Sequence, residues 1–213
     1  MDIQLKNFLN EFNKVSKELG VQYINIEDFD WRYIVSLVPH RAIFLKSVCQ
    51  FLNISIRSIA EIGVWQGESS KLFSMLFPKA QLYLVDPWKC SSEYLLKENG
   101  PMSSNSKAFE NAYKRVKKTF QKNPNCKILR KTSLKAASRV PDELDLVFID
   151  GAHSYENVKQ DIALWLPKVR KGGILSGHDY SLEHPGVLKA VDEAFDKKIK
   201  IGYDRTWIYL NIY

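Results

Sequence analysis

Residues 144–151 read LDLVFIDG and residues 172–180 read GGILSGHDY, and these two stretches decide the fold. Each is an apolar run that becomes polar only at its end, which is typical of parallel strands buried on both faces of a sheet. In such sheets the functional residues gather at the carboxyl ends of the strands. If the two strands are neighbours, Asp150, His178 and Asp179 share one edge of the sheet.

Outward from these runs, short apolar stretches alternate with stretches of helical periodicity. The pattern predicts strands over 57–62, 81–85, 126–130, 144–149 and 172–176, and helices over 67–77, 104–121, 134–139, 155–169 and 187–196. Such alternation indicates an α/β protein with a doubly wound, Rossmann-like, mostly parallel sheet. Residues 198–213 predict a C-terminal antiparallel hairpin with Asp204 and Arg205 at its turn, which makes seven strands in all.

The chain length of 213 residues favours one domain with an extension over two full domains. Helical patterns over 2–19 and 40–52 predict an N-terminal helical extension over 1–53, and the α/β domain follows over 54–213. The polar segment 89–106 is expected to form a lid above the sheet. No apolar run approaches the ~20 residues of a membrane span, and three widely spaced cysteines fit no disulfide framework. We therefore expect a cytoplasmic protein with reduced cysteines. The sequence leaves open whether it forms a homo-oligomer.

The net charge of +7 is concentrated on one predicted helix. Its basic residues alternate with Phe109, Tyr113, Val116 and Phe120, which follow helical spacing, so the positive charges fall on the outer face. They are Lys107, Lys114, Arg115, Lys117, Lys118 and Lys122. A solvated face is the favoured interpretation, and a nucleic-acid surface is the alternative.

A glycine-bearing turn follows the first strand of the sheet and leads directly into a helix. It runs from Glu61 through Gly63 and Trp65 to Gly67, and the next strand ends at Asp86. Such a turn lets a ligand approach the backbone, and a carboxylate at the second strand end can accept ribose hydroxyls. Because Trp65 stands where a dinucleotide fingerprint needs glycine, we expect a nucleoside without a pyrophosphate at this turn.

A second site is predicted where Asp150 meets His178 and Asp179. Two crowded carboxylates repel each other unless a cation neutralises them, and a divalent ion such as Mg²⁺, Mn²⁺ or Fe²⁺ fits this mixed ligand set. His153, three residues after Asp150, is the candidate general base, since an imidazole titrates near neutral pH. Alternatively, His153 caps the following helix. His184 is interpreted as surface or structural.

Residues 57–212 resemble a class I S-adenosylmethionine-dependent methyltransferase. The resemblance implies that Glu61, Gly63 and Gly67 face the methionine part of the cofactor and that Asp86 holds the ribose. Trp65, in the same turn, is also expected to contact the cofactor. The resemblance also implies adenine contacts from Ser133, with its neighbour Thr132, and from Trp88. Alternatively, Trp88 is an ordinary hydrophobic anchor of its loop.

The stretch DGAHSYE, followed by GGILSGHDY, is similar to the methyltransferase domain 24 group and more distantly to macrocin-type sugar O-methyltransferases. This resemblance implies that Asp150, His178 and Asp179 bind Mg²⁺ and that His153 is the base, with Asp150 also in the catalytic machinery. His178 departs from several relatives, which carry a carboxylate there.

These features favour S-adenosylmethionine-dependent, metal-assisted O-methylation of a sugar, glycolipid or other small hydroxyl compound. A nucleic-acid methyltransferase is the second interpretation, but DGAH stands where such enzymes usually carry an N/D-P-P-Y-like loop. An NAD-type oxidoreductase is disfavoured by the missing middle glycine. A cofactor-binding module without catalysis is the fourth interpretation, and the set of His153 and Asp179 speaks against it.

Overall fold

The computed structural model describes residues 40–89 and 106–212, together with the helical backbone at residues 7, 10, 14 and 17. The helix predicted over 2–19 and the lid predicted over 89–106 therefore fall mostly outside the described residues. In the described part of the chain, no helix is both long and apolar enough to cross a membrane.

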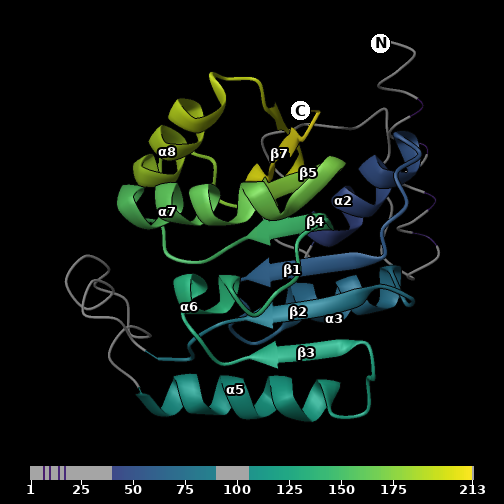
Figure 1. Ribbon diagram of the computed structural model, residues 1–213, viewed down its shortest axis with the longest axis vertical. Coiled ribbons are helices and arrows are strands. Elements are labelled where there is room, and N and C mark those ends of the chain that lie inside the picture. The colour runs from purple at the N-terminus through teal and green to yellow at the C-terminus, as the bar shows by residue number, and fades with distance from the viewer. Residues whose placement is uncertain are drawn as a thin grey trace.

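Seven strands form one sheet in the spatial order β3-β2-β1-β4-β5-β7-β6 (Figure 1). Their bounds are β1 Ser58–Ile62, β2 Gln81–Val85, β3 Cys126–Leu129, β4 Leu144–Ile149, β5 Val169–Gly177, β6 Lys200–Ile201 and β7 Trp207–Leu210. Strands β1 to β5 pair in parallel, whereas β7 is antiparallel to both β5 and β6. The predicted seven-stranded, mostly parallel sheet with a C-terminal hairpin is confirmed.

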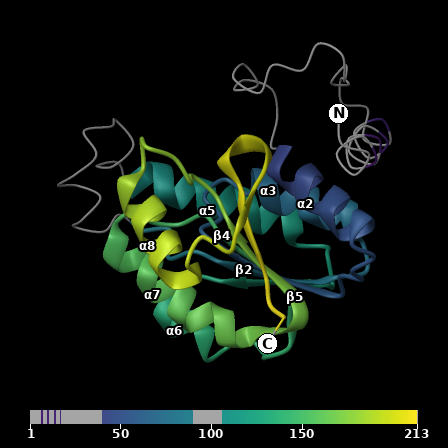
Figure 2. The same ribbon diagram turned by 90° about the horizontal axis from the view of Figure 1, so that it is seen from above.

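Helices cover both faces of the sheet. One hydrophobic core joins the sheet to α2 (His40–Phe51), α3 (Glu68–Leu76) and α5 (Ser106–Phe120). A second core joins the opposite face to α6 (Ser133–Ala137), α7 (Tyr155–Trp165) and α8 (Pro185–Phe195). Figure 2 shows the sheet between these two groups of helices. All six residues of β4 are buried, as the apolar sequence of this strand predicts for the middle of a covered sheet.

The order in which strands are added to the sheet reverses at β1. The chain pairs β1 with β2 on one side and then returns to place β4 on the other side. At such a switch point the loops after two neighbouring strands diverge, which opens a crevice at the carboxyl ends of the strands. The loops after β1 and β4 are those that carry the predicted site residues.

Helix α2, which belongs to the predicted N-terminal extension, shares the core of the sheet. Its residues Ala42, Ile43 and Leu45 are fully buried in the same cluster as Phe73 of α3. This packing fixes the orientation of the helix and places Arg41 in its first turn beside the carboxyl ends of the strands.

The start of β5 differs from the prediction. Helix α7 ends at Trp165, and a 3₁₀ turn, η2 (Leu166–Lys168), follows it, so that β5 begins at Val169 and not at residue 172. Pro167 lies in this turn and interrupts the helical hydrogen bonding, because proline has no backbone N–H. Val169 then pairs with Leu144, and an irregularity follows before regular pairing resumes at Ile174.

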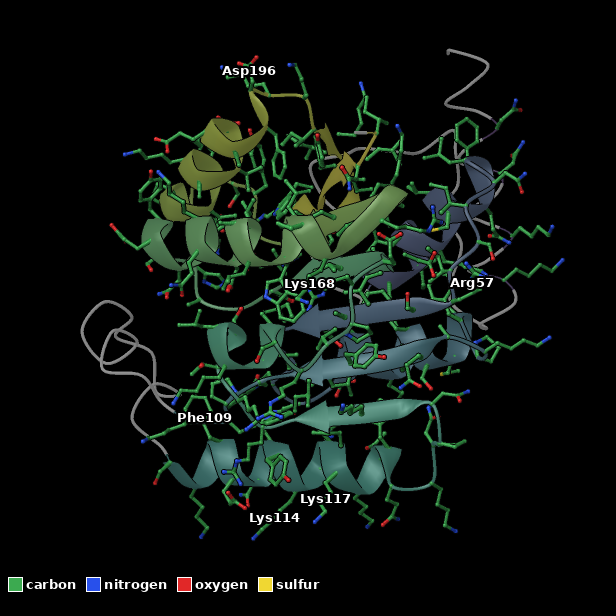
Figure 3. All side chains as sticks on the ribbon, in the orientation of Figure 1. Arg57, Phe109, Lys114, Lys117, Lys168 and Asp196 are labelled. Atoms are coloured by element: carbon green, nitrogen blue, oxygen red, sulfur yellow. The ribbon has the colours of Figure 1, made fainter. Side chains whose placement is uncertain are left out.

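The hairpin and the basic helix follow the sequence pattern. Asp204 and Arg205 lie in a short turn, η3 (Tyr203–Arg205), between β6 and β7, and both have positive φ. On α5, Val116 is buried, whereas Lys114 and Lys117 are exposed and point away from the sheet (Figure 3). The predicted outer basic face is therefore present on this helix.

Candidate active site

One cavity of about 750 Å³ opens at the carboxyl ends of the parallel strands. This volume is within the usual range for small-molecule and cofactor sites. Segments far apart in the sequence line it, among them the glycine turn after β1 and the polar residues that follow β4 and β5. Asp86, Asp150 and Asp179 all face this cavity, so the three strand ends share the edge that the sequence predicts.

The glycine turn touches the loop after β4. Gly63 has a φ of +91°, and a Cβ atom on it would lie only 2.0 Å from the carbonyl oxygen of Asp150. Only glycine permits this approach. Gly67, by contrast, faces α5, because its Cβ position is 3.0 Å from Val116 Cγ2, and it is not among the described residues that line the cavity.

Asp86 anchors the glycine turn to the end of β2. Its Oδ2 accepts hydrogen bonds from the backbone N–H groups of Val64 (3.0 Å) and Trp65 (2.9 Å), and its Oδ1 accepts one from Trp88 (2.6 Å). Burial raises the pKa of Asp86, and the three N–H donors oppose this shift by stabilising the carboxylate. Since Oδ1 receives one of these bonds, it keeps capacity to accept another.

Trp88 lies in the core and not on the cavity wall. The residue is 2% exposed, its ring centroid lies 5.1 Å from that of Tyr113, and its Nε1 donates to the carbonyl of Trp65. Of the residues predicted to surround the adenine, Thr132 and Ser133 line the cavity, and Ser133 accepts a hydrogen bond from Trp165 Nε1. Asp161 also lines the cavity. Burial raises its pKa to about 6, although a hydrogen bond from Ser133 acts in the opposite direction.

Glu61 is fully buried at the end of β1 and accepts a short hydrogen bond from Ser70. Burial raises the pKa of Glu61 to about 8; the bond from Ser70 opposes the rise, and the charges of Asp150 and Asp86 add to it. Burial therefore favours the protonated form of this carboxyl group at neutral pH.

Asp150, His178 and Asp179 converge as the sequence predicts. His178 Nδ1 lies 3.7 Å from Asp150 Oδ1 and 3.1 Å from Asp179 Oδ1. One ligand atom from each residue can be chosen so that all three lie within 4.8 Å of one another. Two oxygens and one imidazole nitrogen at this spacing fit a small divalent cation. Asp179 has a φ of 59°, the kind of backbone conformation that clusters at functional sites.

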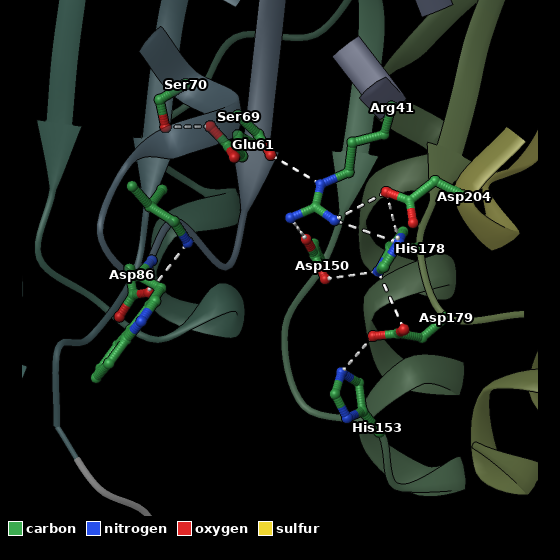
Figure 4. Close-up of polar contacts among 12 residues, drawn as sticks. Arg41, Glu61, Ser69, Ser70, Asp86, Asp150, His153, His178, Asp179 and Asp204 are labelled. Carbon is green, nitrogen blue, oxygen red and sulfur yellow. Dashed lines mark hydrogen bonds and ion pairs between the residues drawn. The ribbon is translucent and has the colours of Figure 1, made fainter. Parts of the chain in front are cut away.

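Arg41 reaches this cluster from α2, and sequence reasoning missed it. Its Nη2 lies 3.3 Å from Asp150 Oδ2, and its Nη1 lies 3.2 Å from His178 Nε2 and 3.4 Å from Asp204 Oδ2. Its Nε donates to Ser69 Oγ at 2.8 Å (Figure 4). The guanidinium therefore contacts Asp150 Oδ2 and His178 Nε2 and leaves Asp150 Oδ1 and His178 Nδ1 for other partners. Through Ser69 it also contacts the start of α3.

Asp204 is the second residue that the sequence did not indicate for the site. Its Oδ2 lies 3.3 Å from His178 Nε2. Burial alone would lower the pKa of His178, but hydrogen bonds to Asp179 and Asp204 and the charge of Asp150 outweigh burial and raise it to about 9. These partners favour the protonated imidazole, and metal ligation through Nδ1 would require the loss of the proton on that nitrogen.

His153 contacts the opposite oxygen of Asp179, with Nε2 3.0 Å from Oδ2. Burial alone would raise the pKa of Asp179, but hydrogen bonds from His153 and His178 hold it well below its usual range. His184, interpreted from the sequence as surface or structural, also belongs here: its Nε2 lies 3.6 Å from Asp179 Oδ1, and its ring centroid lies 4.3 Å from that of His153. The side chain that caps α7 is Ser154, which accepts from Asn157.

Comparison with known proteins identifies the family. Residues 60–180, more than half of the chain, match the model of a methyltransferase domain, methyltransferase domain 24. The chain belongs to this methyltransferase family. The matched segment contains Asp150, His153, His178 and Asp179, whereas Arg41 lies outside it.

Solved O-methyltransferase structures share the fold of this methyltransferase. NovP has a TM-score of 0.61 at 16% identity, with 99% of this chain and all of NovP covered. TomG from Streptomyces achromogenes, in complex with SAM, has a TM-score of 0.56 at 13% identity, covering 96% and 89%. An O-methyltransferase from Bacillus cereus in complex with SAH has a TM-score of 0.56 at 13% identity, covering 94% and 89%. At these identities the likeness establishes a common fold.

A curated relative matches over a shorter stretch. The uncharacterized protein y4gI of Sinorhizobium fredii is 34% identical over 61 residues, which make up 28% of this chain. The matched stretch spans 7% of the length of that relative.

Proposed function

We propose that this methyltransferase uses S-adenosylmethionine to methylate a hydroxyl group of a sugar, a glycolipid head group or another small polyol. The observation that carries the proposal is that one cavity is lined both by the glycine turn with Asp86 and by Asp150, His153, His178 and Asp179. Membership in the methyltransferase family supports it, as does the common fold with TomG, whose structure is a complex with SAM.

The glycine turn and the strand ends on either side of it would hold the cofactor. Gly63 and Trp65 lie along the cavity beside Glu61, where the methionine part would bind, and Asp86 would accept a ribose hydroxyl at Oδ1. Ser133 would line the adenine end. When bound, S-adenosylmethionine supplies an already activated methyl group, so the protein's remaining tasks are to position the acceptor and remove its proton.

Asp150, His178 and Asp179 would hold a divalent cation, with Mg²⁺ the favoured ion. A cation at this position makes an acceptor hydroxyl more acidic. Asp204 would orient His178 by accepting from Nε2, an arrangement that fixes the ring of a metal-binding histidine and leaves Nδ1 for the ligand bond. Arg41 would orient Asp150 in the same way through Oδ2.

His153 would act as the general base. If its Nε2–H donates to Asp179 Oδ2, the neutral ring carries its lone pair on Nδ1, and that nitrogen can accept the proton of the acceptor hydroxyl. His153 would take the proton from the acceptor oxygen as that oxygen receives the methyl group that S-adenosylmethionine supplies, and the proton would stay on His153. Asp179 then stabilises the imidazolium that results.

Calorimetric titration tests the cofactor. Purified protein is titrated with S-adenosylhomocysteine and, separately, with NAD, each with and without Mg²⁺. We expect saturable binding of S-adenosylhomocysteine only. Binding of NAD in its place would overturn the assignment and favour the oxidoreductase alternative.

Methyl transfer tests the reaction and its base. Wild-type protein is incubated with methyl-labelled S-adenosylmethionine, Mg²⁺ and a panel of sugars, glycolipids, polyols and RNA. We expect transfer to a hydroxyl compound, and a loss of about 100-fold or more in the His153→Ala variant. Ser154→Ala is the matched control, because it weakens the start of α7 by about 1 kcal/mol but removes no base. Full activity in His153→Ala would exclude His153 as the base, and labelling of RNA alone would favour the nucleic-acid alternative.

A further inference from the structure

Asp150, His178 and Asp179 are called the first cluster below. Beside it lie three side chains of types that can bind metals, namely His153, Asp179 and His184. His153 Nε2 lies 3.0 Å from Asp179 Oδ2, and His184 Nε2 lies 3.6 Å from Asp179 Oδ1. One nitrogen from each histidine and one oxygen of Asp179 all lie within 4.8 Å of one another. Side-chain exposures of 14 to 26% leave all three accessible from the solvent side.

The fold brings these side chains together through the close approach of two helix starts. His153 precedes α7, and His184 is the residue before α8. The first turn of α8 lies so near the loop after β4 that a Cβ atom on Gly186 would be 2.4 Å from the carbonyl oxygen of His153. Glycine at this position therefore allows His184 to approach His153, and their ring centroids lie 4.3 Å apart.

The ligand chemistry of this group differs from that of the first. Asp150, His178 and Asp179 offer two carboxylates and one imidazole, whereas His153, Asp179 and His184 offer two imidazoles and one carboxylate. Imidazole-rich sets favour Zn²⁺ and similar transition ions over Mg²⁺, and three protein ligands leave a further position for water or another ligand.

We propose that His153, Asp179 and His184 form a second metal-binding site, specific for Zn²⁺ and similar transition ions, which shares Asp179 with the first cluster. A metal bound at Nε2 of His153 leaves the ring proton on Nδ1, so that the ring has no lone pair with which to accept a proton. Zinc at this site therefore inhibits methyl transfer. This inhibition rests on the proposed function, but zinc binding does not.

The binding test compares metal-free wild type with His184→Ala and His178→Ala, using competition for Zn²⁺ with a chromophoric chelator and the visible absorption spectrum of added Co²⁺. Loss of an outer-shell partner alone typically weakens metal binding about 10- to 100-fold, so loss of the direct ligand His184 should weaken it by at least about 100-fold. His178→Ala removes a ligand from the first cluster but only a hydrogen-bond partner of Asp179 from the second site, so it should weaken zinc binding less than His184→Ala does. His184→Gln, with circular dichroism of each variant, controls for a folding defect.

Equal zinc affinity in wild type, His184→Ala and His184→Gln would overturn the site. So would loss of zinc binding in His178→Ala with retention in His184→Ala, because zinc would then occupy the first cluster.

The inhibition test measures methyl transfer with saturating Mg²⁺ and increasing Zn²⁺, each variant relative to its own rate without zinc. We expect zinc to inhibit methyl transfer by the wild type. The same degree of inhibition in His184→Ala should require a zinc concentration about 100-fold higher. Zinc binding through His184 without inhibition of an active enzyme would overturn the inhibitory role. Zinc binding through His184 in a protein that methylates no acceptor would support the metal site and count against the proposed function.

Discussion

Arg41 Nη2 lies 3.3 Å from Asp150 Oδ2, and this ion pair ties the first turn of α2 to the end of β4. The two side chains are 22% and 17% exposed, so the pair is partly protected from solvent. The guanidinium offsets the charge of Asp150, whereas His178 lies between Asp150 and Asp179. A divalent ion would add to the charge of the guanidinium from the other side of the carboxylates.

The first prediction concerns Arg41→Gln. The substitution removes the guanidinium from Asp150 and Asp204, which His178 still contacts, and should destabilise the metal-free protein by about 1–3 kcal/mol. Mg²⁺ should then stabilise the variant more than the wild type, because the guanidinium charge that offsets the carboxylates and repels the ion is gone. Thermal unfolding with and without Mg²⁺ measures both effects. Arg41→Lys keeps the charge and should behave in between, whereas equal shifts with Mg²⁺ in all three proteins would contradict the prediction.

The second prediction compares the stability effects of alanine substitutions at two glycines, Gly63 and Gly151, at the carboxyl edge of the sheet. Gly63→Ala should destabilise the protein by about 3 kcal/mol or more, because the new Cβ would lie 2.0 Å from a backbone oxygen and the residue has positive φ. Gly151→Ala should cost less than about 1 kcal/mol, since its nearest atoms are 3.8 Å away. Urea unfolding of the two variants provides the comparison, and equal stabilities would show that the turn can move away from Asp150.

The strand ends were predictable because they follow from local patterns and one topological rule. Apolar runs that end in Asp150 and in His178-Asp179 identify the strands, and parallel neighbours bring such ends to one edge. The glycine turn and Asp86 were found in the same way. The cavity therefore contains most of the residues that the sequence indicated.

Residues that depend on tertiary packing were not predictable. Arg41 is an ordinary polar residue at the start of an amphipathic helix, and only the packing of α2 against α3 directs it toward Asp150. His184 reaches Asp179 because Gly186 lets α8 approach a distant loop. Trp88 shows the converse: an aromatic residue after a strand can turn inward, and its burial depends on the position of Tyr113 on α5.

The third prediction is that Asp86 has two effects. Asp86→Asn should weaken binding of S-adenosylhomocysteine about 10- to 100-fold, because an amide is a poorer acceptor for a ribose hydroxyl than a carboxylate. The substitution should also lower the free energy of unfolding by about 1–3 kcal/mol. The side-chain NH₂ group of asparagine replaces one carboxylate oxygen, and it cannot accept the hydrogen bonds that backbone N–H groups donate to that oxygen in the wild type. Calorimetry and urea unfolding measure the two effects. Asp196→Asn, on an exposed carboxylate far from these contacts, should change neither, and an Asp86→Asn variant that binds normally would remove the ribose role.

The fourth prediction is a pH dependence that Glu61 contributes. Its pKa in the folded protein is about 8, above the value of 4.5 for the free side chain, so the folded state retains a proton that the unfolded state loses. This contribution is fully present below pH 4.5, declines as the pH rises toward 8 and is lost above it. Glu61→Gln removes the ionisation but keeps a partner for Ser70. The stability of the variant relative to wild type should therefore increase by roughly a few kcal/mol between pH 5 and 8 and then level off. Urea unfolding at each pH measures this difference, and a constant difference over that range would show that Glu61 is ionised in the folded protein.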